Sequence, residues 1–415
     1  MKYLIVIPDG SADDPIDSMG GKTPLEAADI PVMDMLASKG EIGTVKTVPE
    51  GISPGSDSAN LSVMGYDPRI YLTGRSPLEA AAIGVDMSST DISFRANFIT
   101  IDPAGEAEYE DYIVRDHAAG DITTEECEEL LKDINAAFAD ENLYFYTGTG
   151  YRHCMLLHKE HPHAHTRYKC VPPHDILDKH AREYLPKGES ADFLIDMMKK
   201  SYDILKDHPV NKARIAKGLN PANSLWIWGQ GTRPELPNFC EKFGVKATVI
   251  SAVDLIRGIG YFAGINVVTV EGADGTINTN YEGKVAMAIS EYERGQDMIY
   301  MHIEGTDECS HQGNLEAKMR CAHYIDSRVV KPLYEYLEST GEDYKILIVP
   351  DHRTPLAIRT HSADPVPFLI YDSRNVLPAD PKKQFNERAG YEANNYIHEG
   401  STLADKFFER KTAGN

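Results

Sequence analysis

The sequence lacks long apolar runs and clustered basic stretches. Apolar runs such as residues 3–7 and 346–349 are far shorter than the roughly 20 residues that a membrane-spanning helix needs. No run of Lys or Arg is longer than two, and 64 acidic against 42 basic residues give a net charge of −22. Because phosphate backbones and anionic lipid surfaces attract clustered positive charge, neither nucleic acid nor a membrane is expected as a partner.

Cysteine is also scarce. The six cysteines are scattered and include no C-x-x-C pair, which argues against a disulfide framework or a zinc ribbon and favours a reducing cytoplasm. The apolar run near the N-terminus is too short for the core of a signal peptide and is interpreted as a first strand. With 42% hydrophobic residues in 415, the chain has enough apolar material for roughly two to three domains.

The sequence does contain an alternation of short apolar runs with amphipathic stretches. Helices are expected over residues 24–37, with a break at Pro31, over 123–138, and over 316–336, with a kink at Pro332. Unalternated apolar runs are typical of strands covered on both faces, as in a parallel sheet between helices. These runs are YLIVI at residue 3, FRANFITI at 94, SLWIWG at 224, INVVTV at 265, MIYMHI at 298, KILIV at 345 and FLIY at 368. Their alternation with helices predicts an α/β protein.

The two ends of the chain share a pattern that the middle does not. YLIVIPDG at residue 3 and KILIVPDH at residue 345 each run from an apolar strand into an aspartate. Between about residues 75 and 233 the predicted strands are farther apart. We therefore predict a discontinuous domain of residues 1–75 and 235–415, with a smaller domain of residues 76–234 inserted into it.

Carboxylates and imidazoles follow several of the predicted strands. The candidate metal ligands are Asp9, Asp307, His311, Asp351, His352 and His361. Carboxyl ends of parallel strands converge at the edge where α/β folds bind ligands, and the i,i+4 spacing of Asp307 and His311 would place both on one helix face. Taken singly, Asp9 is as readily a cap and His311 a solvent-facing residue, whereas Asp351-His352 would be costly to bury without a partner. Two ions, Mn²⁺, Zn²⁺ or Mg²⁺, suit such a set.

Ser56, in Pro54-Gly55-Ser56-Asp57, is the candidate nucleophile. Without the metal set, an ordinary turn serine would be the first interpretation. A serine hydroxyl is a weak nucleophile at neutral pH, and coordination to a metal is one way to activate it. The sequence has no G-x-S-x-G elbow, which disfavours a Ser-His-Asp hydrolase.

Longer motifs resemble one family. They are IPDG at residue 7, GGKTPLEAA at 20, PGSDSANLSVMGYDP at 54, GRSPLEAAAIG at 74, PPHDI at 172, WGQG at 228, SAVDLIRGIG at 251, EGTDECSHQG at 304 and VPDHRTP at 349. By these motifs the chain resembles the archaeal-type, cofactor-independent phosphoglycerate mutases of the alkaline phosphatase superfamily. The resemblance implies an alkaline-phosphatase-like, doubly wound, mostly parallel sheet with a smaller inserted α+β domain that binds substrate.

The resemblance also implies roles for the candidate residues. Ser56 would become phosphorylated and share one ion with Asp9, Asp351 and His352, and a second ion would lie on Asp307, His311 and His361. Mn²⁺ is the first expectation, with Zn²⁺, Mg²⁺ and Co²⁺ as alternatives. The implied reaction interconverts 3-phosphoglycerate and 2-phosphoglycerate in glycolysis or gluconeogenesis. The phosphoryl group passes to Ser56 and returns to the other hydroxyl, with no free bisphosphoglycerate.

Arginines in or beside the motifs are expected to bind the substrate, because the guanidinium fork donates two hydrogen bonds to phosphate or carboxylate. The substrate candidates are Arg75, Arg115, Arg152, His174, Arg233 and Arg257, and Asp116 is the candidate acid or base for a glycerate hydroxyl. The alternatives are a solvated surface charge for a lone arginine and a buried structural residue for His174. VRDHAAG also departs from the family pattern, which has another basic residue where His117 stands.

Three alternative functions remain open at this stage. The first is a related phosphotransferase that uses another small hydroxyl-bearing acceptor, such as a proposed homoserine kinase. The second is a metal-dependent phosphomonoesterase, in which water attacks phospho-Ser56. The third is a silent metal-binding scaffold, which is disfavoured because every proposed ligand and the nucleophile are present.

Overall fold

The structure is a computed structural model that describes residues 1–410, in two units that each have their own sheet. The first unit comprises residues 1–72 and the chain from Glu235 onward, and the second unit is Thr73–Pro234. Arg75 therefore lies in the second unit. No helix within residues 1–410 is long and apolar enough to cross a membrane.

The first unit is built on an eight-stranded mixed sheet with the order β13-β2-β12-β11-β1-β10-β8-β9. Its strands are β1 (Lys2–Pro8), β2 (Glu41–Val45), β8 (Ala247–Ile250), β9 (Asn266–Val268), β10 (Met298–Ile303), β11 (Tyr344–Ile348), β12 (Val366–Asp372) and β13 (Tyr396–Ile397). Five adjacent strands, from β11 to β9, run parallel, and β12 is antiparallel to both of its neighbours. The prediction of an α/β fold with a mostly parallel sheet is confirmed.

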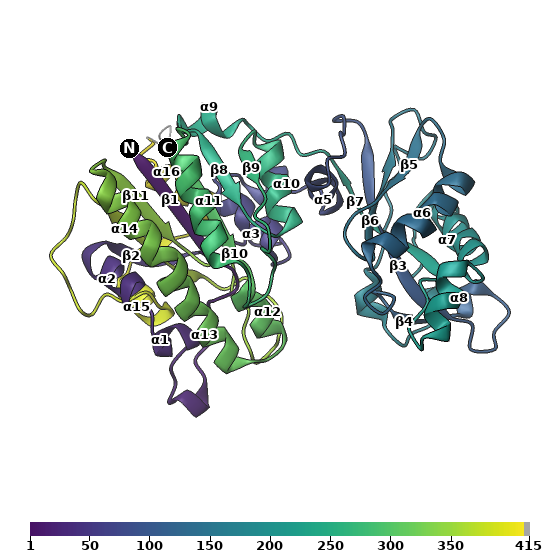
Figure 1. Cartoon of the computed structure of the whole chain (residues 1–415), viewed down its shortest axis with the longest axis horizontal. Helices are drawn as coiled ribbons and strands as arrows, with labels where there is room; N and C mark the ends of the chain where they lie inside the picture. The colour runs from purple at the N-terminus through teal and green to yellow at the C-terminus, as the bar shows by residue number, and fades with distance from the viewer. Residues whose placement is uncertain (411–415) are drawn as a thin grey trace. The chain divides into compact units, whose positions relative to one another are not determined.

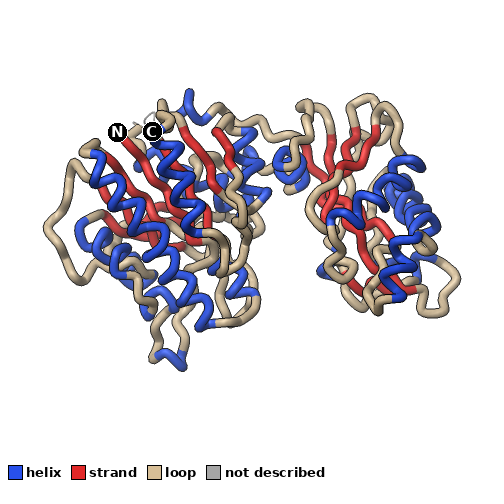
Figure 2. Tube along the Cα trace, in the orientation of Figure 1, coloured by secondary structure: helices blue, strands red, loops and turns tan. Residues whose placement is uncertain are grey.

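Helices cover both faces of this sheet (Figures 1 and 2). They are α1 (Pro24–Ala27), α2 (Pro31–Lys39), α3 (Ser56–Val63), α4 (Pro68–Tyr71), α9 (Phe239–Phe243), α10 (Asp254–Phe262), α11 (Tyr281–Glu293), α12 (Gly305–His311), α13 (Leu315–Ile325), α14 (Lys331–Thr340), α15 (Glu387–Glu392) and α16 (Leu403–Phe407), with the short η1 (Asp17–Met19) and η6 (Gly400–Thr402). Leu4 and Val6 of β1 share a core with α11, α13 and α14. Tyr3 points to the other face, where its ring centroid lies 5.6 Å from that of Phe407 in α16. This alternation is the period-2 pattern of a strand buried on both sides.

The expected helix breaks are present, with one shift in position. A break separates α1 from α2 before Pro31, and Thr123 forms a capping box with Glu126 at the start of α6 (Thr124–Phe138). The distortion expected at Pro332 lies instead in the π-helical segment η5 (Asp326–Val330) that precedes it. Proline cannot donate to the carbonyl of Arg328 and its ring clashes with that carbonyl, so the preceding turn widens.

The second unit is built on an antiparallel sheet. Its strands are β3 (Ile92–Asp102), β4 (Ile113–Asp116), β5 (Leu143–Tyr146), β6 (Arg152–Leu157) and β7 (Ser224–Thr232), in the order β4-β3-β6-β5 with β7 on β3. Its helices are α5 (Ser76–Ala82), α6, α7 (Ala191–Leu205) and α8 (Pro209–Ala216), with η2 (Tyr109–Asp111), η3 (Pro173–Ile176) and η4 (Ala181–Glu183).

The run at residue 368 lies in β12, which is antiparallel to both neighbours, so it was wrongly predicted as a parallel strand. The runs at residues 94 and 224 were wrongly predicted as parallel strands as well. They are β3 and β7, which pair antiparallel. Both lack polar alternation because the sheet is covered on two sides. Met155 and Leu157 of β6 pack with α6 and α7, while Cys154 and Leu156 pack with α5. Burial on both faces removes the alternation whatever the strand direction.

Candidate functional site

The C-terminal ends of three central strands bring the predicted acidic residues together. Asp9 follows β1, α12 with Asp307 begins after β10, and Asp351 comes shortly after β11. β1 pairs in parallel with both neighbours, with Pro8 opposite Ile303 and Val6 opposite Ile348. The residues after these strands therefore meet at one edge of the sheet, the edge at which open α/β folds bind ligands.

At this edge the predicted metal ligands form two groups. Asp9, Asp351 and His352, all buried, form one group, and Asp307, His311 and His361 form the other. In each group the potential ligand atoms lie within 4.8 Å of one another. Asp307 Oδ2 is 3.1 Å from His311 Nε2, one turn along α12, and Asp307 Oδ1 is 3.5 Å from His361 Nε2.

Backbone carbonyls orient two of the imidazoles. His311 Nδ1 lies 2.9 Å from the carbonyl oxygen of Arg359, and His361 Nδ1 lies 3.4 Å from that of Pro54. A ring nitrogen that faces a carbonyl carries a proton, so Nε2 is the atom of each ring that would lose its proton to bind an ion. Both Nε2 atoms face Asp307, as two ligands of one ion would.

Ser56 lies beside the first group. It is the first residue of α3, and its Oγ is 3.3 Å from His352 Nε2. The positive end of the helix dipole at this terminus favours a negative charge on the nucleophile or on an attached phosphoryl group. The glycine-rich sequence around Ser56 suggested a turn, whereas in the structure Gly55 is the cap residue and Ser56 begins α3.

The buried carboxylates have strongly perturbed ionisation. Burial raises the pKa of Asp9 well above its usual range, and repulsion from Asp351 and Asp307 raises it further. Burial also disfavours the charged form of Asp307, but hydrogen bonds with His311 and His361 outweigh it and lower the pKa. Asp9 Oδ1 is buried and accepts no hydrogen bond from any described residue. A cation would offset the repulsion between the carboxylates and would give Asp9 Oδ1 a partner, so these residues fit metal ions.

Two polar residues that were not predicted from the sequence hold Asp351. The Tyr300 hydroxyl donates to Asn60 Oδ1 at 2.6 Å, and Asn60 Nδ2 donates to Asp351 Oδ2 at 2.9 Å and to the Ser56 carbonyl at 2.8 Å. On the same strand, His302 Nε2 lies 3.1 Å from Asp9 Oδ2. The available signal was the polar pair Tyr300 and His302 at alternating positions of the otherwise apolar run MIYMHI.

In the second unit, Arg75 and Arg152 lie near a buried arginine that the sequence analysis also missed. The Arg95 guanidinium lies over the Trp228 ring at 4.2 Å, and its Nε is 2.8 Å from Glu79 Oε2. Burial lowers the pKa of Arg95, and the positive charges of Arg75 and Arg152 lower it further although Glu79 opposes them. Arg95 was missed because its run, FRANFITI, was interpreted only as a strand.

Two histidines lie beside these arginines. The centroid of the His174 ring lies 5.6 Å from that of Trp228 and 6.1 Å from that of His117. The rings of His117 and Tyr151 pack edge to face, with their centroids 5.7 Å apart. Burial lowers the pKa of His174, and the neighbouring Arg95 and His117 lower it further. Asp175 has the opposite effect but does not outweigh them. We call Arg75, Arg95, His117, Arg152 and His174 the cationic group.

Arg115 and Asp116 are engaged in contacts of their own. Exposed Arg115 forms ion pairs with Asp102 at 3.2 Å and Asp178 at 2.9 Å. Asp116 accepts hydrogen bonds from two backbone N–H groups of the following turn and from Asn220. Burial raises the pKa of Asp116, but these bonds outweigh burial and lower it. A carboxylate that accepts three hydrogen bonds is a weak base, so these contacts do not favour an acid–base role for Asp116. That role stays a prediction.

The last two predicted arginines lie in different units. Arg233 donates from Nη1 to the Met87 carbonyl at 2.7 Å in the second unit. Arg257 lies on α10 of the first unit and pairs with Asp254 at 2.9 Å. Their substrate-binding roles stay predictions.

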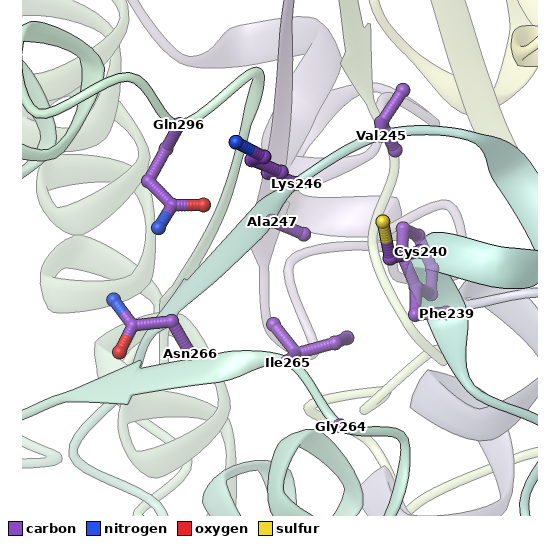
Figure 3. Close-up of a pocket in the computed structure, with 9 residues that line it drawn as sticks. All are labelled: Phe239, Cys240, Val245, Lys246, Ala247, Gly264, Ile265, Asn266 and Gln296. Atoms are coloured by element: carbon purple, nitrogen blue, oxygen red, sulfur yellow. The ribbon is translucent and has the colours of Figure 1, made fainter.

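A pocket of about 190 Å³ lies at the other edge of the first unit's sheet. It is lined by residues around the starts of β8 and β9 and by Gln296, which precedes β10. Gln296 and Asn266 lie on one side and Phe239 and Cys240 on the other (Figure 3). Because ligands of open α/β folds bind at the carboxyl ends of strands, this pocket is not the candidate active site.

Comparisons with known proteins agree on one family. The family model described as 2,3-bisphosphoglycerate-independent phosphoglycerate mutase matches residues 37–211. The protein of that name from Methanosarcina barkeri is 45% identical over 389 residues, which cover 94% of each chain. A solved cofactor-independent phosphoglycerate mutase from Thermoplasma acidophilum has a TM-score of 0.62 and 25% identity over 99% of both chains. The PH0037 protein from Pyrococcus horikoshii has a TM-score of 0.79 and 29% identity, over 100% of this chain and 99% of its own.

Proposed function

The chain belongs to the 2,3-bisphosphoglycerate-independent phosphoglycerate mutases, a family of isomerases, and we propose on this premise that it interconverts 3-phosphoglycerate and 2-phosphoglycerate. The observation that carries the proposal is the position of Ser56 beside the first of two carboxylate–imidazole groups at one edge of the sheet. That arrangement combines a nucleophile with two sites for positive charge, as phosphoryl transfer requires.

We propose that each group holds one divalent cation. Asp9, Asp351 and His352 would hold one ion with Ser56, and Asp307, His311 and His361 would hold the other. Oxygen and imidazole ligands suit Mn²⁺, with Zn²⁺, Mg²⁺ and Co²⁺ as alternatives. The buried Asp9 Oδ1 without a hydrogen-bond partner among the described residues supports this assignment. When bound, the cations would favour the Ser56 alkoxide and neutralise charge on the phosphoryl oxygens.

The proposed chemistry uses Ser56 twice. Its Oγ loses its proton and attacks phosphorus, the bond from phosphorus to the substrate oxygen breaks, and that oxygen takes up a proton to leave glycerate and phospho-Ser56. The other hydroxyl of the glycerate then loses its proton and attacks phosphorus, the bond to Ser56 Oγ breaks, and Ser56 Oγ takes up a proton again. The N-terminus of α3 favours the anionic phosphoserine, and Asn60 fixes the Ser56 backbone through its carbonyl.

We further propose that the cationic group binds the acidic substrate. Glu79 and Trp228 hold Arg95 in one orientation, so little side-chain freedom is lost when an anion binds. Arg152 is exposed and therefore accessible to a carboxylate or phosphate. Burial is the main reason for the lowered pKa of Arg95, and the positive charges of Arg75 and Arg152 lower it further. A bound anion would relieve that repulsion.

Arg152→Met is expected to lower kcat/KM for 3-phosphoglycerate by about 10- to 100-fold, because a hydrogen bond to a charged group is lost. The matched control is Arg182→Met, an exposed arginine of the same unit that pairs with Asp111 at 2.7 Å. This control should retain wild-type kinetics. Steady-state assays of both variants test the prediction, and equal kcat/KM for the two would remove Arg152 from substrate binding.

The proposed function itself is tested with purified protein, Mn²⁺ and 3-phosphoglycerate in the absence of bisphosphoglycerate. Formation of 2-phosphoglycerate is followed through coupled enolase. Release of inorganic phosphate without 2-phosphoglycerate would identify a phosphomonoesterase instead. No turnover of 3-phosphoglycerate, together with phosphorylation of homoserine from a phosphoryl donor, would identify a kinase.

A further inference from the structure

Thr354 lies between the two proposed ion sites. It is completely buried, two residues after His352. Its hydroxyl donates to Asp307 Oδ1 at 2.6 Å and lies 3.2 Å from His352 Nδ1. One hydroxyl group therefore contacts a proposed ligand of each ion.

The chemistry of the three groups fixes the direction of these hydrogen bonds. An ionised carboxylate only accepts, so the single hydroxyl proton of Thr354 is directed to Asp307. The hydroxyl oxygen then accepts from His352, whose Nδ1 carries the ring proton. This tautomer leaves the His352 Nε2 lone pair on the side of Ser56 Oγ at 3.3 Å and Asp9 Oδ1 at 3.6 Å. Thr354 thus sets the orientation of one ligand in each group.

The surroundings of Thr354 leave the hydroxyl little freedom. Its carbonyl accepts a 3.0 Å hydrogen bond from Lys318 Nζ, and buried Lys318 pairs with Asp13 at 2.7 Å. Gly10, with φ of +60°, also lies close to this hydroxyl. A Cβ at Gly10 would lie 2.5 Å from Thr354 Oγ1 and 2.6 Å from Asp307 Oδ1. Only glycine leaves room for this pair of side chains.

We propose that Thr354 is a positioning residue that couples the binding of the two cations. The inference rests on the proposed function, because it requires both ion sites. A cation on His352 makes Nδ1–H a stronger donor to Thr354, which polarises the hydroxyl toward Asp307. Occupancy of the first site thereby orders a ligand of the second, and by thermodynamic linkage the effect is reciprocal.

The test compares Mn²⁺ binding to the full-length, metal-stripped chain by titration calorimetry. Thr354→Ser keeps the hydroxyl and is expected to bind both ions within about threefold of wild type. Thr354→Ala and Thr354→Val lack the hydroxyl and are expected to weaken both binding events by about 10-fold or more. Thr44→Val removes a hydroxyl from another buried threonine, on β2, and should bind as wild type does.

Each outcome decides the inference. If Ala and Val variants bind both ions with wild-type affinity, or if only one event weakens, Thr354 does not couple the sites. If the wild-type chain binds fewer than two Mn²⁺ ions, the proposed two-ion function is wrong and this inference fails with it. This result concerns the wild-type stoichiometry, so it is distinguishable from unchanged affinities in the variants. Thermal unfolding in chelator identifies a variant that fails to fold. If Thr354→Val does so, the Ser and Ala variants, which differ by one hydroxyl, still decide.

Discussion

Ser56→Ala is expected to lower turnover of 3-phosphoglycerate by about 10⁴-fold or more. The variant has no oxygen to accept the phosphoryl group, and none of the neighbouring imidazoles replaces it in the proposed route. The six carboxylate and imidazole ligands remain, so Mn²⁺ binding should persist, weakened by the loss of one oxygen. Coupled assays measure turnover, calorimetry measures ion binding, and mass spectrometry of acid-quenched wild-type enzyme should detect phosphate on Ser56.

The matched control for this variant is Ser62→Ala. Ser62 is a buried serine on the same helix, α3, and lies outside both ligand groups. Its replacement tests whether a serine-to-alanine change in α3 disturbs the site through packing alone. Ser62→Ala should retain wild-type turnover. If Ser56→Ala keeps more than a small fraction of that turnover, Ser56 is not the nucleophile.

Exhaustive removal of divalent cations is expected to abolish turnover, and added Mn²⁺ should restore it. Without cations, the buried Asp9, Asp307 and Asp351 repel one another and no positive charge balances the phosphoryl group in the transition state. Stability should change as well. An ion present at about 1,000 times its dissociation constant adds about 4 kcal/mol to the free energy of unfolding. Calorimetric scans of stripped and reloaded protein measure this difference.

The pH dependence of Mn²⁺ binding offers a second readout of the same site. Because the pKa of Asp9 is raised, its carboxyl holds a proton at a pH where an ordinary aspartate is ionised. An ion must displace that proton, so Mn²⁺ affinity is expected to rise with pH until Asp9 is fully ionised.

Activity and stability that are indifferent to chelation would rule out the two-ion site.

Much of the candidate site could be predicted from the sequence because its parts follow a local rule. Asp9 and Asp351 come directly after buried strands, and Asp307 and His311 have helical spacing. Each of these patterns is visible within a few residues. Parallel pairing of β1 with β10 and β11 then brings them together, and a mostly parallel sheet was already expected from the apolar runs.

The supporting residues could not be predicted because their roles arise from contacts between distant segments. Asn60 and Tyr300 are 240 positions apart in the sequence, and Thr354 and Asp307, which share a hydrogen bond, are 47 positions apart. Arg95 is indistinguishable in the sequence from a charge at a strand edge until the fold places Trp228 beneath it. Likewise, local patterns reveal that β3 and β7 are buried, but strand direction depends on partners that no single segment specifies.

The point of insertion has a consequence for how such an enzyme can diversify. Every proposed ion ligand and Ser56 belong to the first unit, whereas the whole cationic group belongs to the second. If the cationic group binds the substrate as proposed, substitutions in residues 73–234 would alter which hydroxy acid is accepted and leave the proposed phosphorylation site unchanged. A phosphotransferase with a new acceptor would need a remodelled insertion but no new catalytic centre. Divergent activities within this family should accordingly differ most in the inserted segment and least in the residues that flank β1, β10 and β11.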